Sequence, residues 1–504
     1  MGGLKNLAAV MEAAAVEQGW TGRPALVVGG RTLTHGEVHD GAARAASVLA
    51  GAGVRRGDAV LLVLPDGAEL ALAFLGAVRL AALAVPVNPL LPSDDHRFLA
   101  QDCAAALVVA DDGLAPCFGS RQAVLTATEL TARLATADPH PAAAVAADER
   151  AYAQYTSGTT GVPRAAVHRH RDPLVHTRAF ARGAIAMGPS DVGLSVSKMY
   201  FAYGLGNSLF FPLLTGARAV LHPGRPRPQE IADLIDRHQV SVLYAVPTFY
   251  ANLLRQVAST SSFASLRVAV SAGEALAPPL ADRAVDRLGC PVLDSLGSTE
   301  VGQAFAGATL DRSRRGTLGP VLSPYEIAVR DDGRRDCPPG QVGVLWVRGP
   351  TVLLEYLGRP EATEAAFDGE WLCTGDRASA DQDGFLSLHG RTDDLEMVGG
   401  ITVAPREIEE LLASHPMVAE AAVVATADRD GGSCLQAFVV PAAELDCDDE
   451  LAAELRDLAR ARLAAYKVPR AVSVVSALPR TPTGKLRHFV LRASPAPRRL
   501  RQAR

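Results

Sequence analysis

Short apolar runs that alternate with helix-like segments limit the possible folds of this 504-residue chain more than any other feature of its sequence. Between about residues 40 and 110, a segment with helical apolar periodicity (HDGAARAASVLAGAG) is followed by the runs AVLLVLP and LAVPVN, which have the length of buried strands. Strands and helices that alternate in this way indicate βαβ units and a parallel sheet. The sequence therefore predicts an α/β fold.

Three further apolar runs lie between residues 240 and 297 and are separated by helix-like intervals. They read VSVLYAVP, LRVAVSAG and CPVLDSLG, and each ends in small or polar turn residues. Parallel strands place their carboxyl ends along one edge of a sheet, where the ligands of such folds bind. We therefore expect a ligand crevice where these runs end. The Ala- and Pro-rich stretch 137–149 is expected to connect two subdomains.

The pattern changes in the last third of the chain. The glycine-punctuated segments YEIAVRDDG and GVLWVRGP after residue 320 favour an antiparallel or barrel-like region. The segment PREIEELLASHP then places Ile408, Leu411 and Leu412 at helical spacing. We predict a large N-terminal domain (1–390), made of parallel-sheet α/β subdomains and a β-barrel-like subdomain, and a small mobile α+β domain (391–504), with a hinge near 391–394. The small domain should also contain strands around 420–426 and 435–440, a helix near 449–464 and a strand at 471–478.

Charge and composition exclude several classes of protein. The 50 basic and 55 acidic side chains give a formal charge of -5, so a nucleic-acid partner is not expected. The apolar runs are too short to span a bilayer and the first residues lack a signal-peptide core, so we expect a cytoplasmic protein with no membrane partner. Seven cysteines without a C-x-x-C pair give no basis for a zinc site or a disulfide framework. A monomer or a homodimer is expected.

The segment from Tyr155 to Arg164 reads YTSGTTGVPR and is rich in hydroxyls and glycines. Small residues let a backbone approach phosphate oxygens, and the arginine adds charge-assisted donors. The Walker pattern G-x-x-x-x-G-K-[ST] is absent, so the chemistry of P-loop ATPases is disfavoured. Taken alone, the segment could equally be a flexible turn. The candidate phosphate-binding residues are Thr156, Ser157, Gly158, Thr159, Thr160, Gly161 and Arg164.

Two acidic segments downstream extend this pattern. Thr299 and Glu300 follow the apolar run that ends at Gly297, so they should lie near the same sheet edge, where a carboxylate can hold Mg²⁺ that bridges phosphates. Asp376 follows a Thr-Gly turn, which suits a carboxylate that accepts hydrogen bonds from two ribose hydroxyls. Taken one at a time, each of these segments would be an ordinary turn or a helix cap.

Together and in this order, these segments, with GRTDD (390–394) and TPTGK (481–485), resemble the AMP-forming adenylating superfamily of acyl-CoA synthetases, carrier-domain adenylation modules and luciferases. The resemblance covers essentially the whole chain. It is closest to the benzoate-CoA-ligase-like aryl-acid:CoA ligases, because KMYFAYGLGN (198–207) looks like their corresponding segment more than that of long-chain fatty-acyl relatives.

The resemblance implies a role for each matching position. The loop that ends at Arg164 would embrace the β- and γ-phosphates, Thr299 would touch the α-phosphate, and Glu300 would hold the metal. Lys485 would bridge the acid and the α-phosphate during adenylate formation, and Asp393 would be the hinge. The other implied positions are Gly273, Glu274, Ala275, Asp294, Ser295, Leu296 and Gly297 around adenine, Asp376 and Arg391 at the ribose, and Gly399 and Gly400 at a thiol tunnel.

The substrate that the resemblance implies is benzoate or a substituted benzoate, and the alternative is a heteroaryl or cinnamate-like acid. An aromatic wall contributes about 0.5 to 1.5 kcal/mol beyond burial through ring contacts, which favours an aryl acid over an aliphatic acid of similar bulk. A ring substituent could reach Lys198, Tyr203 or Gln303. The candidate substrate-binding residues are Lys198, Phe201, Ala202, Tyr203, Gly204 and Gln303.

The reaction implied is that of an acid-thiol ligase, with ATP, Mg²⁺ and CoA as cofactors or co-substrates. The acid's carboxylate attacks the α-phosphorus, and cations lower the barrier by offsetting the repulsion of two anions. The acyl-adenylate then passes its acyl group to CoA. The alternative acceptor is a carrier-protein pantetheine thiol or a nitrogen nucleophile. A nucleotide-sensing scaffold without turnover is disfavoured because both Glu300 and Lys485 are retained.

Three positions depart from the family pattern. Arg164 stands where relatives commonly have lysine, which keeps the charge but changes its geometry, so phosphate binding should survive. Met397 stands where many relatives have lysine. Gln303 lies near the place where aryl-acid relatives often have histidine. The second and third departures motivate the alternative acceptor.

Overall fold

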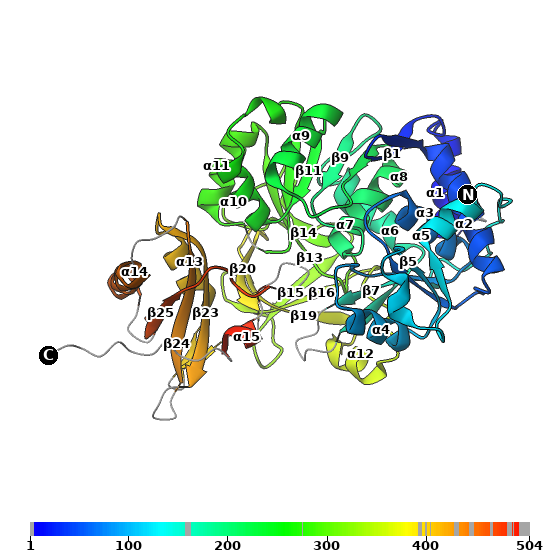
Figure 1. Cartoon of the computed structure of the whole chain (residues 1–504). Coiled ribbons are helices and arrows are strands. Elements are labelled where there is room, and N and C mark those ends of the chain that lie inside the picture. Colours follow the sequence, from blue (N-terminus) through cyan, green and yellow to red (C-terminus); the bar gives the residue numbers. More distant parts are fainter. Residues whose placement is uncertain are drawn as a thin grey trace.

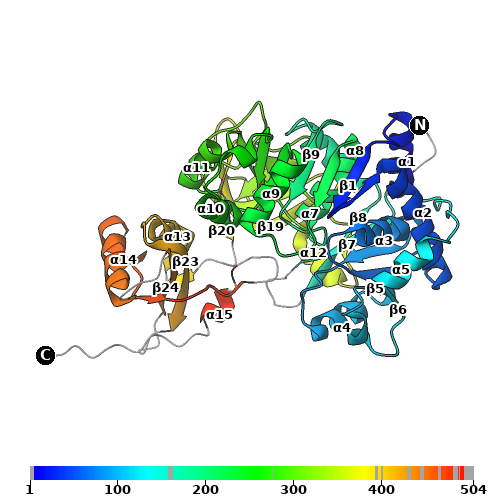
Figure 2. The same cartoon turned by 45° about the horizontal axis from the view of Figure 1, so that its top comes forward.

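The computed structural model describes residues 5–156, 163–274, 276–391, 396–398, 401–403, 405–427, 433–442, 448–463, 467–480, 486 and 488–492. Two large α/β sheets, an antiparallel sheet and a smaller C-terminal sheet organise the molecule (Figure 1). Figures 1 and 2 both place the C-terminal elements to one side of the two large sheets. Among the helices in the described part of the chain, none is both long and apolar enough to cross a membrane.

The first large sheet has the strand order β17-β8-β7-β4-β3-β5-β6. Its first five strands in the chain run parallel, and β8 and β17 extend the sheet with antiparallel pairing. The predicted runs at 59–65 and 83–88 form β3 and β4, which are fully buried, as expected for parallel strands covered on both faces. The strands are β3 (Ala59–Val63), β4 (Leu83–Pro86), β5 (Ala105–Ala110), β6 (Val124–Thr126), β7 (Arg150–Thr156), β8 (Arg164–Arg169) and β17 (Glu355–Tyr356).

Residues 137–149 form neither helix nor strand, in agreement with the prediction of a connector. They lead from the helix after β6 to the start of β7. Strands β6 and β7 belong to the same sheet. The prediction that this stretch joins two subdomains is therefore wrong. The helices and the short 3-10 turn of this part are α1 (Leu7–Glu17), α2 (His35–Gly51), α3 (Ala68–Arg79), α4 (Ser93–Asp102), η1 (Ala115–Phe118) and α5 (Ala127–Leu134).

The second large sheet has the order β14-β13-β12-β11-β9-β10-β1-β2. The three runs predicted between 240 and 297 form β11, β12 and β13, which are parallel neighbours, so their carboxyl ends lie along one sheet edge. This confirms the placement expected from the sequence. The strands are β1 (Pro24–Val28), β2 (Arg31–Thr34), β9 (Val192–Ser195), β10 (Arg218–Leu221), β11 (Val242–Ala245), β12 (Val268–Ser271), β13 (Val292–Gly297) and β14 (Ala304–Gly307).

The helices around this sheet begin where the sequence supplies proline. Pro228, Pro247 and Pro278 each stand at the first position of a helix, where the missing N–H removes no helical hydrogen bond. Two segments adopt the wider π-helical turn that is common near functional sites. The elements are α6 (Asp172–His176), η2 (π, Thr177–Arg182), α7 (Ala202–Leu205), η3 (π, Gly206–Phe210), α8 (Phe211–Thr215), α9 (Pro228–His238), α10 (Pro247–Gln256), η4 (3-10, Ser261–Phe263) and α11 (Pro278–Leu288).

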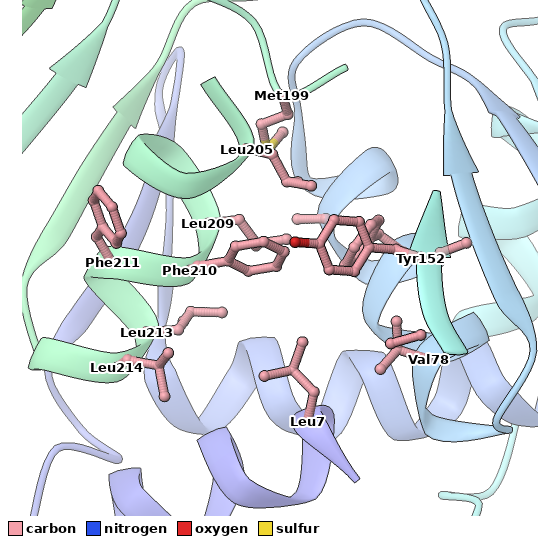
Figure 3. Close-up of a cluster of buried hydrophobic side chains, with 14 of the residues drawn as sticks. Leu7, Val78, Tyr152, Met199, Leu205, Leu209, Phe210, Phe211, Leu213 and Leu214 are labelled. Carbon is pink, nitrogen blue, oxygen red and sulfur yellow. The ribbon is translucent and has the colours of Figure 1, made fainter. Parts of the chain in front are cut away.

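One apolar core joins the two large sheets (Figure 3). The ring of Tyr152 on β7 faces that of Phe210 on η3, with centroids 5.4 Å apart, and Phe74 of α3 lies 5.8 Å from each. Figure 3 also places Leu7 of α1 beneath this cluster. These side chains are fully buried, so the segment 198–210 is fixed against the first sheet.

An antiparallel sheet follows, as the glycine-punctuated segments predict. Its order is β15-β16-β19-β18, and β20 pairs with β19. All of these pairs are antiparallel. The elements are β15 (Glu326–Arg330), β16 (Gly343–Arg348), α12 (Pro360–Ala366), β18 (Phe367–Asp368), β19 (Trp371–Ala380) and β20 (Leu386–Arg391).

The C-terminal part has an α+β architecture, as predicted. Its main sheet, β23-β24-β25, pairs β23 and β24 antiparallel and β24 and β25 parallel. Ile408 and Leu412 are buried in a core with Val423 and Leu455, which explains the helical spacing in the sequence. The predicted hinge residue Asp393 lies outside the described residues. The elements are β21 (Glu396–Val398), β22 (Ile401–Val403), α13 (Pro405–Ala413), β23 (Val418–Ala427), β24 (Ser433–Pro441), α14 (Asp448–Arg462), β25 (Ala471–Val474) and α15 (His488–Arg492).

Candidate functional site

The predicted phosphate loop connects two strands that pair with each other. Thr156 ends β7, Arg164 begins β8, and the two residues are direct partners in the antiparallel ladder. The two ends of the loop are therefore held together at the edge of the first sheet. Five of the predicted phosphate-binding residues lie outside the described residues: Ser157, Gly158, Thr159, Thr160 and Gly161.

An aromatic ring connects this loop to the predicted metal carboxylate. The guanidinium carbon of Arg164 lies 5.6 Å from the centre of the Tyr356 ring, within cation-π range. The Tyr356 hydroxyl donates a hydrogen bond to Oε1 of Glu300 at 3.0 Å. β17 brings Tyr356 to this place because it pairs with β8, opposite Ala166. Sequence reasoning missed Tyr356, which lies 56 residues from Glu300, so no local pattern could have indicated it.

Thr299 and Glu300 lie in the turn between β13 and β14. Two glycines give this turn its shape: Gly302 has a φ of 85°, and a side chain at Gly297 would come within 2.8 Å of the backbone of Gln303. The Gly302 amide donates to the Ser298 carbonyl at 2.9 Å and closes the turn. The structure thus places both predicted catalytic residues of this segment at the carboxyl end of β13, beside the edge that carries Arg164.

Asp294 organises the predicted adenine side of the site. It is buried, and its carboxylate accepts hydrogen bonds from the amides of Leu276 at 2.9 Å and Ser295 at 3.1 Å. Burial raises the pKa of Asp294 to about 7, and the two amides oppose that rise. The Ser295 hydroxyl donates to the Ser271 carbonyl at 3.0 Å. These bonds join β12 and β13, and Leu296 and Gly297 complete the strand.

The turn after β12 carries the other predicted adenine residues. Gly273 has a φ of 92°, which favours glycine. Glu274 forms an ion pair with Arg480 of the C-terminal part, at 3.8 Å, and Arg480 also donates to Glu420 at 2.7 Å. Sequence reasoning missed Arg480 because this contact joins remote parts of the chain. Ala275 lies outside the described residues.

The two predicted ribose residues lie opposite each other in the antiparallel sheet. Asp376 of β19 and Arg391 of β20 are direct partners in the ladder. The turn that precedes Asp376 is held by Thr374, whose hydroxyl accepts from the Asp376 amide at 3.1 Å and donates to the Leu345 carbonyl at 3.0 Å. The structure therefore brings these two residues together although 15 positions separate them in the sequence.

The aromatic segment on the predicted acid side is packed through its rings. The Phe201 ring lies edge-to-face against Tyr200, with centroids 4.6 Å apart, and the Tyr203 ring lies edge-to-face against Tyr244 at 6.2 Å. A side chain at Gly204 would lie 2.0 Å from the Lys198 carbonyl oxygen, so only glycine fits there. Ala202 begins α7 directly after Phe201.

The polar groups on this side are bound to backbone carbonyls. The buried Lys198 ammonium donates to the His222 carbonyl, and the Tyr203 hydroxyl donates to the Val270 carbonyl at 3.2 Å. The Gln303 amide nitrogen donates to the Tyr203 carbonyl at 3.4 Å. Gln303 and Tyr203 are therefore neighbours. The polar groups expected to meet a ring substituent already have partners within the protein.

Burial also shifts the pKa values of two side chains in this region, Asp66 and Lys198. Asp66 is completely buried and accepts a hydrogen bond from the Met199 amide at 2.9 Å. Burial raises the pKa of Asp66 to about 6, and the charge of Lys198 opposes that rise. Burial also lowers the pKa of Lys198, and Asp66 opposes that fall. Burial thus favours the neutral form of each side chain, and the attraction between their charges offsets part of that effect.

Four further predicted residues have no described position. They are Asp393, Gly399, Gly400 and Lys485.

Comparison with known proteins identifies the family to which the chain belongs. Residues 12–357 match the AMP-binding enzyme family and residues 407–485 match the AMP-binding enzyme C-terminal domain. The chain is 45% identical over 491 residues to a p-hydroxybenzoic acid-AMP ligase of Mycobacterium tuberculosis, covering 97% of this chain and 68% of that relative. It is 35% identical over 495 residues to a 4-hydroxybenzoate-CoA/benzoate-CoA ligase of Rhodopseudomonas palustris, covering 95% of this chain and 92% of the relative.

The fold agrees with solved structures as well. A benzoate CoA ligase from Burkholderia xenovorans matches with a TM-score of 0.90 and 33% identity, over 97% of this chain and 100% of that one. The resemblance predicted from the ordered motifs is confirmed. The chain belongs to the family of AMP-binding enzymes, and it is similar to the aryl-acid ligases of that family across nearly its whole length.

Proposed function

We propose that this enzyme activates benzoate or a hydroxybenzoate with ATP, forming an acyl-adenylate and pyrophosphate. The observation that carries the proposal is the contact series from Arg164 through Tyr356 to Glu300. It places a cation from the phosphate loop and a carboxylate at the end of β13 in one connected group. Such a group suits a polyphosphate chain and its counterion better than it suits an uncharged ligand.

The residues present fit a bound Mg²⁺. Among the described residues, no group of three or more His, Cys, Asp or Glu side chains could hold a metal by itself. Mg²⁺ prefers one or two carboxylates, with substrate phosphates and water as its other ligands, so Glu300 would be its protein ligand. When bound, the ion offsets negative charge on the phosphates.

The chain's own residues would perform the rest of the first half-reaction. The acid's carboxylate oxygen attacks the α-phosphorus and pyrophosphate leaves, so no general base is needed. Lys485, by its match to the family motif, would neutralise the two anions as they meet, and Thr299 would donate to the α-phosphate. Asp376 and Arg391 would hold the ribose, and the segment around Asp294 would hold adenine.

The acid side would select its substrate mainly by shape. The Tyr203 hydroxyl already donates its one hydrogen to a backbone carbonyl, and the Lys198 ammonium donates one of its three hydrogens to another, so few donors remain for a ring substituent. The wall of Phe201, Ala202 and Tyr203 would then recognise the ring through aromatic contacts. A benzoate with a para-hydroxyl is proposed by similarity to the relatives named for p-hydroxybenzoic acid and benzoate.

The thiol acceptor of the second half-reaction is proposed to be CoA, by similarity to the relatives that are named CoA ligases. Gly399 and Gly400 would border the path of its pantetheine arm. A second candidate is a carrier-protein pantetheine thiol, favoured because the 45% identical relative is named an AMP ligase rather than a CoA ligase. The two differ only in what carries the thiol, so the acyl transfer itself is the same.

The first test is acid-dependent exchange between ATP and radioactive pyrophosphate with a panel of aryl and alkyl acids. Exchange with benzoate or 4-hydroxybenzoate and none with hexanoate is expected. Lys485→Ala should lower this exchange by at least about 100-fold while the enzyme still passes the acyl group of supplied aryl-AMP to a thiol. Absence of exchange with every aryl acid would overturn the proposed activity.

The acceptor needs a separate measurement. Aryl-AMP formed in place would be offered CoA or a phosphopantetheinylated carrier domain, and thioester would be quantified by mass spectrometry. CoA thioester formed at the rate of adenylation supports the ligase. Acylated carrier with only background CoA thioester supports the second candidate and removes the first.

A further inference from the structure

Two buried histidines contact the backbone of the segment that contains Glu300. His168 Nε2 lies 2.8 Å from the Thr299 carbonyl oxygen, and His176 Nε2 lies 2.9 Å from the Val301 carbonyl oxygen. A carbonyl oxygen only accepts, so both imidazoles carry their hydrogen on Nε2 and donate. The two donors therefore bind the peptide units on either side of Glu300.

The carbonyl between these two is bound as well. The Leu353 amide donates to the Glu300 carbonyl at 2.7 Å, and the Thr351 hydroxyl donates to the Val301 carbonyl at 2.9 Å. Three successive carbonyls, from Thr299 to Val301, thus accept hydrogen bonds from groups that are remote in the sequence. A turn with every carbonyl bound keeps one backbone conformation.

The imidazoles are themselves held in place. His168, His176 and Asp172 are all completely buried. With its hydrogen on Nε2, His168 presents a bare Nδ1 to the Asp172 carboxylate at 3.4 Å, so this contact adds no hydrogen bond and packing holds the ring. The Tyr152 ring, part of the core shown in Figure 3, stacks on the His168 ring with centroids 5.1 Å apart.

Gly302 shows that the turn and the imidazoles are fitted to one another. A Cβ at this position would lie 2.7 Å from Cε1 of His176 and 3.1 Å from Cε1 of His168. The two rings therefore occupy the space beside the turn in which a side chain would stand. A shift of either ring would remove one of the hydrogen bonds that hold the turn, and a shift of the turn would disturb both imidazole bonds.

We propose that His168 and His176 are positioning residues that hold the backbone on both sides of Glu300, so that its carboxylate meets Mg²⁺ and the phosphates of ATP in a fixed place. The inference rests on the proposed function. Neither imidazole touches substrate, and both act through the peptide units they bind. Placement of such a ligand within about 0.5 Å decides how well it works, which gives two buried donors a functional effect.

The test uses the full chain and three substitutions at His168. His168→Gln keeps an amide N–H near the place of Nε2, whereas His168→Asn and His168→Leu lose that donor. The matched control is His170→Leu. His170 is two positions away and is equally buried, but its Nδ1 accepts from the Leu7 amide instead of reaching the turn.

We expect His168→Leu and His168→Asn to raise the Mg²⁺ concentration for half-maximal exchange by about tenfold, the effect of one lost hydrogen bond. His168→Gln should stay within about twofold of the unmodified protein. His170→Leu should lower the unfolding temperature without changing the Mg²⁺ requirement. If His168→Leu does not fold, the Asn and Gln variants carry the comparison.

A readout without turnover separates this inference from the proposed activity. Hydrogen exchange of residues 296–305 in metal-free protein should be faster in His168→Asn than in His168→Gln, and MgATP should raise the unfolding temperature less in the Asn variant. Equal exchange and equal MgATP shifts in the two would overturn the positioning role. Unmodified protein that exchanges no pyrophosphate but shows both differences would overturn the proposed activity alone.

Discussion

On the phosphate side of the site, remote side chains bind the backbone of residues 299–301, whereas on the acid side the side chains of Lys198, Tyr203 and Gln303 bind backbone carbonyls. The first arrangement fixes the chain and leaves its side chains to bind a ligand. The second engages the polar side chains and leaves ring surfaces to bind a ligand. If the proposed function holds, recognition of charge and recognition of shape have different structural supports in this site.

The difference shows which change should damage which function. A charged ligand needs a few groups in fixed places, so loss of one group has a large effect. A ring that is held by its shape depends on many small contacts, so the space around it matters more than any single group. The predictions below test this contrast in order of decreasing effect.

Glu300→Gln should have the largest effect, because it removes the carboxylate that would meet Mg²⁺ but keeps the size of the side chain. Acid-dependent pyrophosphate exchange should fall by about 100-fold or more while the KM for the acid changes little. Glu326→Gln, which breaks an exposed ion pair with Arg348, is the matched control and should retain activity. A large rise in the acid's KM for Glu300→Gln would contradict the separation of the two sides.

Gly206→Ala tests the acid side. The added Cβ would lie 2.1 Å from the Gln303 amide nitrogen, so the amide must move, at a cost of about 1 to 3 kcal/mol. The KM for the aryl acid should rise about tenfold with the KM for ATP unchanged, as initial-rate kinetics would report. Gly188→Ala is the control, since a Cβ there meets nothing within 4 Å. Equal effects on both KM values would mean that the two sides are not independent.

The response of stability to pH should distinguish two buried groups. Asp66, with a pKa raised to about 6, binds its proton more readily folded than unfolded, so it stabilises the fold as pH falls from 7 to 5, by about 1 kcal/mol. Burial lowers the pKa of His170 to about 4, so protonation of the unfolded chain destabilises the fold over the same range, by about 2 kcal/mol. In urea unfolding, the free energy of unfolding of Asp66→Asn should fall more steeply between pH 7 and 5 than that of the unmodified protein. That of His170→Gln should fall less steeply. The opposite pair of slopes would refute these assignments.

Tyr356→Phe should have the smallest effect. It keeps the ring beside Arg164 but removes the hydroxyl that donates to Glu300, which contributes about 1 kcal/mol. Pyrophosphate exchange should fall about fivefold. It should fall further in Tyr356→Leu, which also removes the ring. A Phe variant as impaired as Glu300→Gln would give Tyr356 a larger part than its single bond implies.

Much of the fold could be predicted because burial leaves a local pattern in the sequence. The runs that became β3, β4, β11, β12 and β13 are short, apolar and bounded by turn residues, which fits strands covered on both faces. The connector 137–149 was harder, because composition shows that a stretch is irregular but not which sheet it returns to.

The site was predictable only where its residues follow one another in the chain. Thr299 and Glu300 come directly after a strand, so their place at a sheet edge follows from the topology. The bond from Tyr356 to Glu300 and the bond from His168 to Thr299 join residues 56 and 131 positions apart. The resemblance makes Lys198 a candidate substrate-binding residue, and only the structure reveals that its ammonium already donates to the His222 carbonyl.

Arg480 contacts one carboxylate in the C-terminal part and another in the large N-terminal part. Its contact with Glu420 at 2.7 Å stays within the C-terminal part, while its contact with Glu274 at 3.8 Å crosses to the adenine side. Glu274 is 41% exposed, so the crossing contact contributes about 1 kcal/mol or less and weakens with salt. The shorter of the two contacts of the Arg480 guanidinium is therefore the one within the C-terminal part. Raising the ionic strength should therefore weaken the link that Arg480 makes between Glu274 and the C-terminal part.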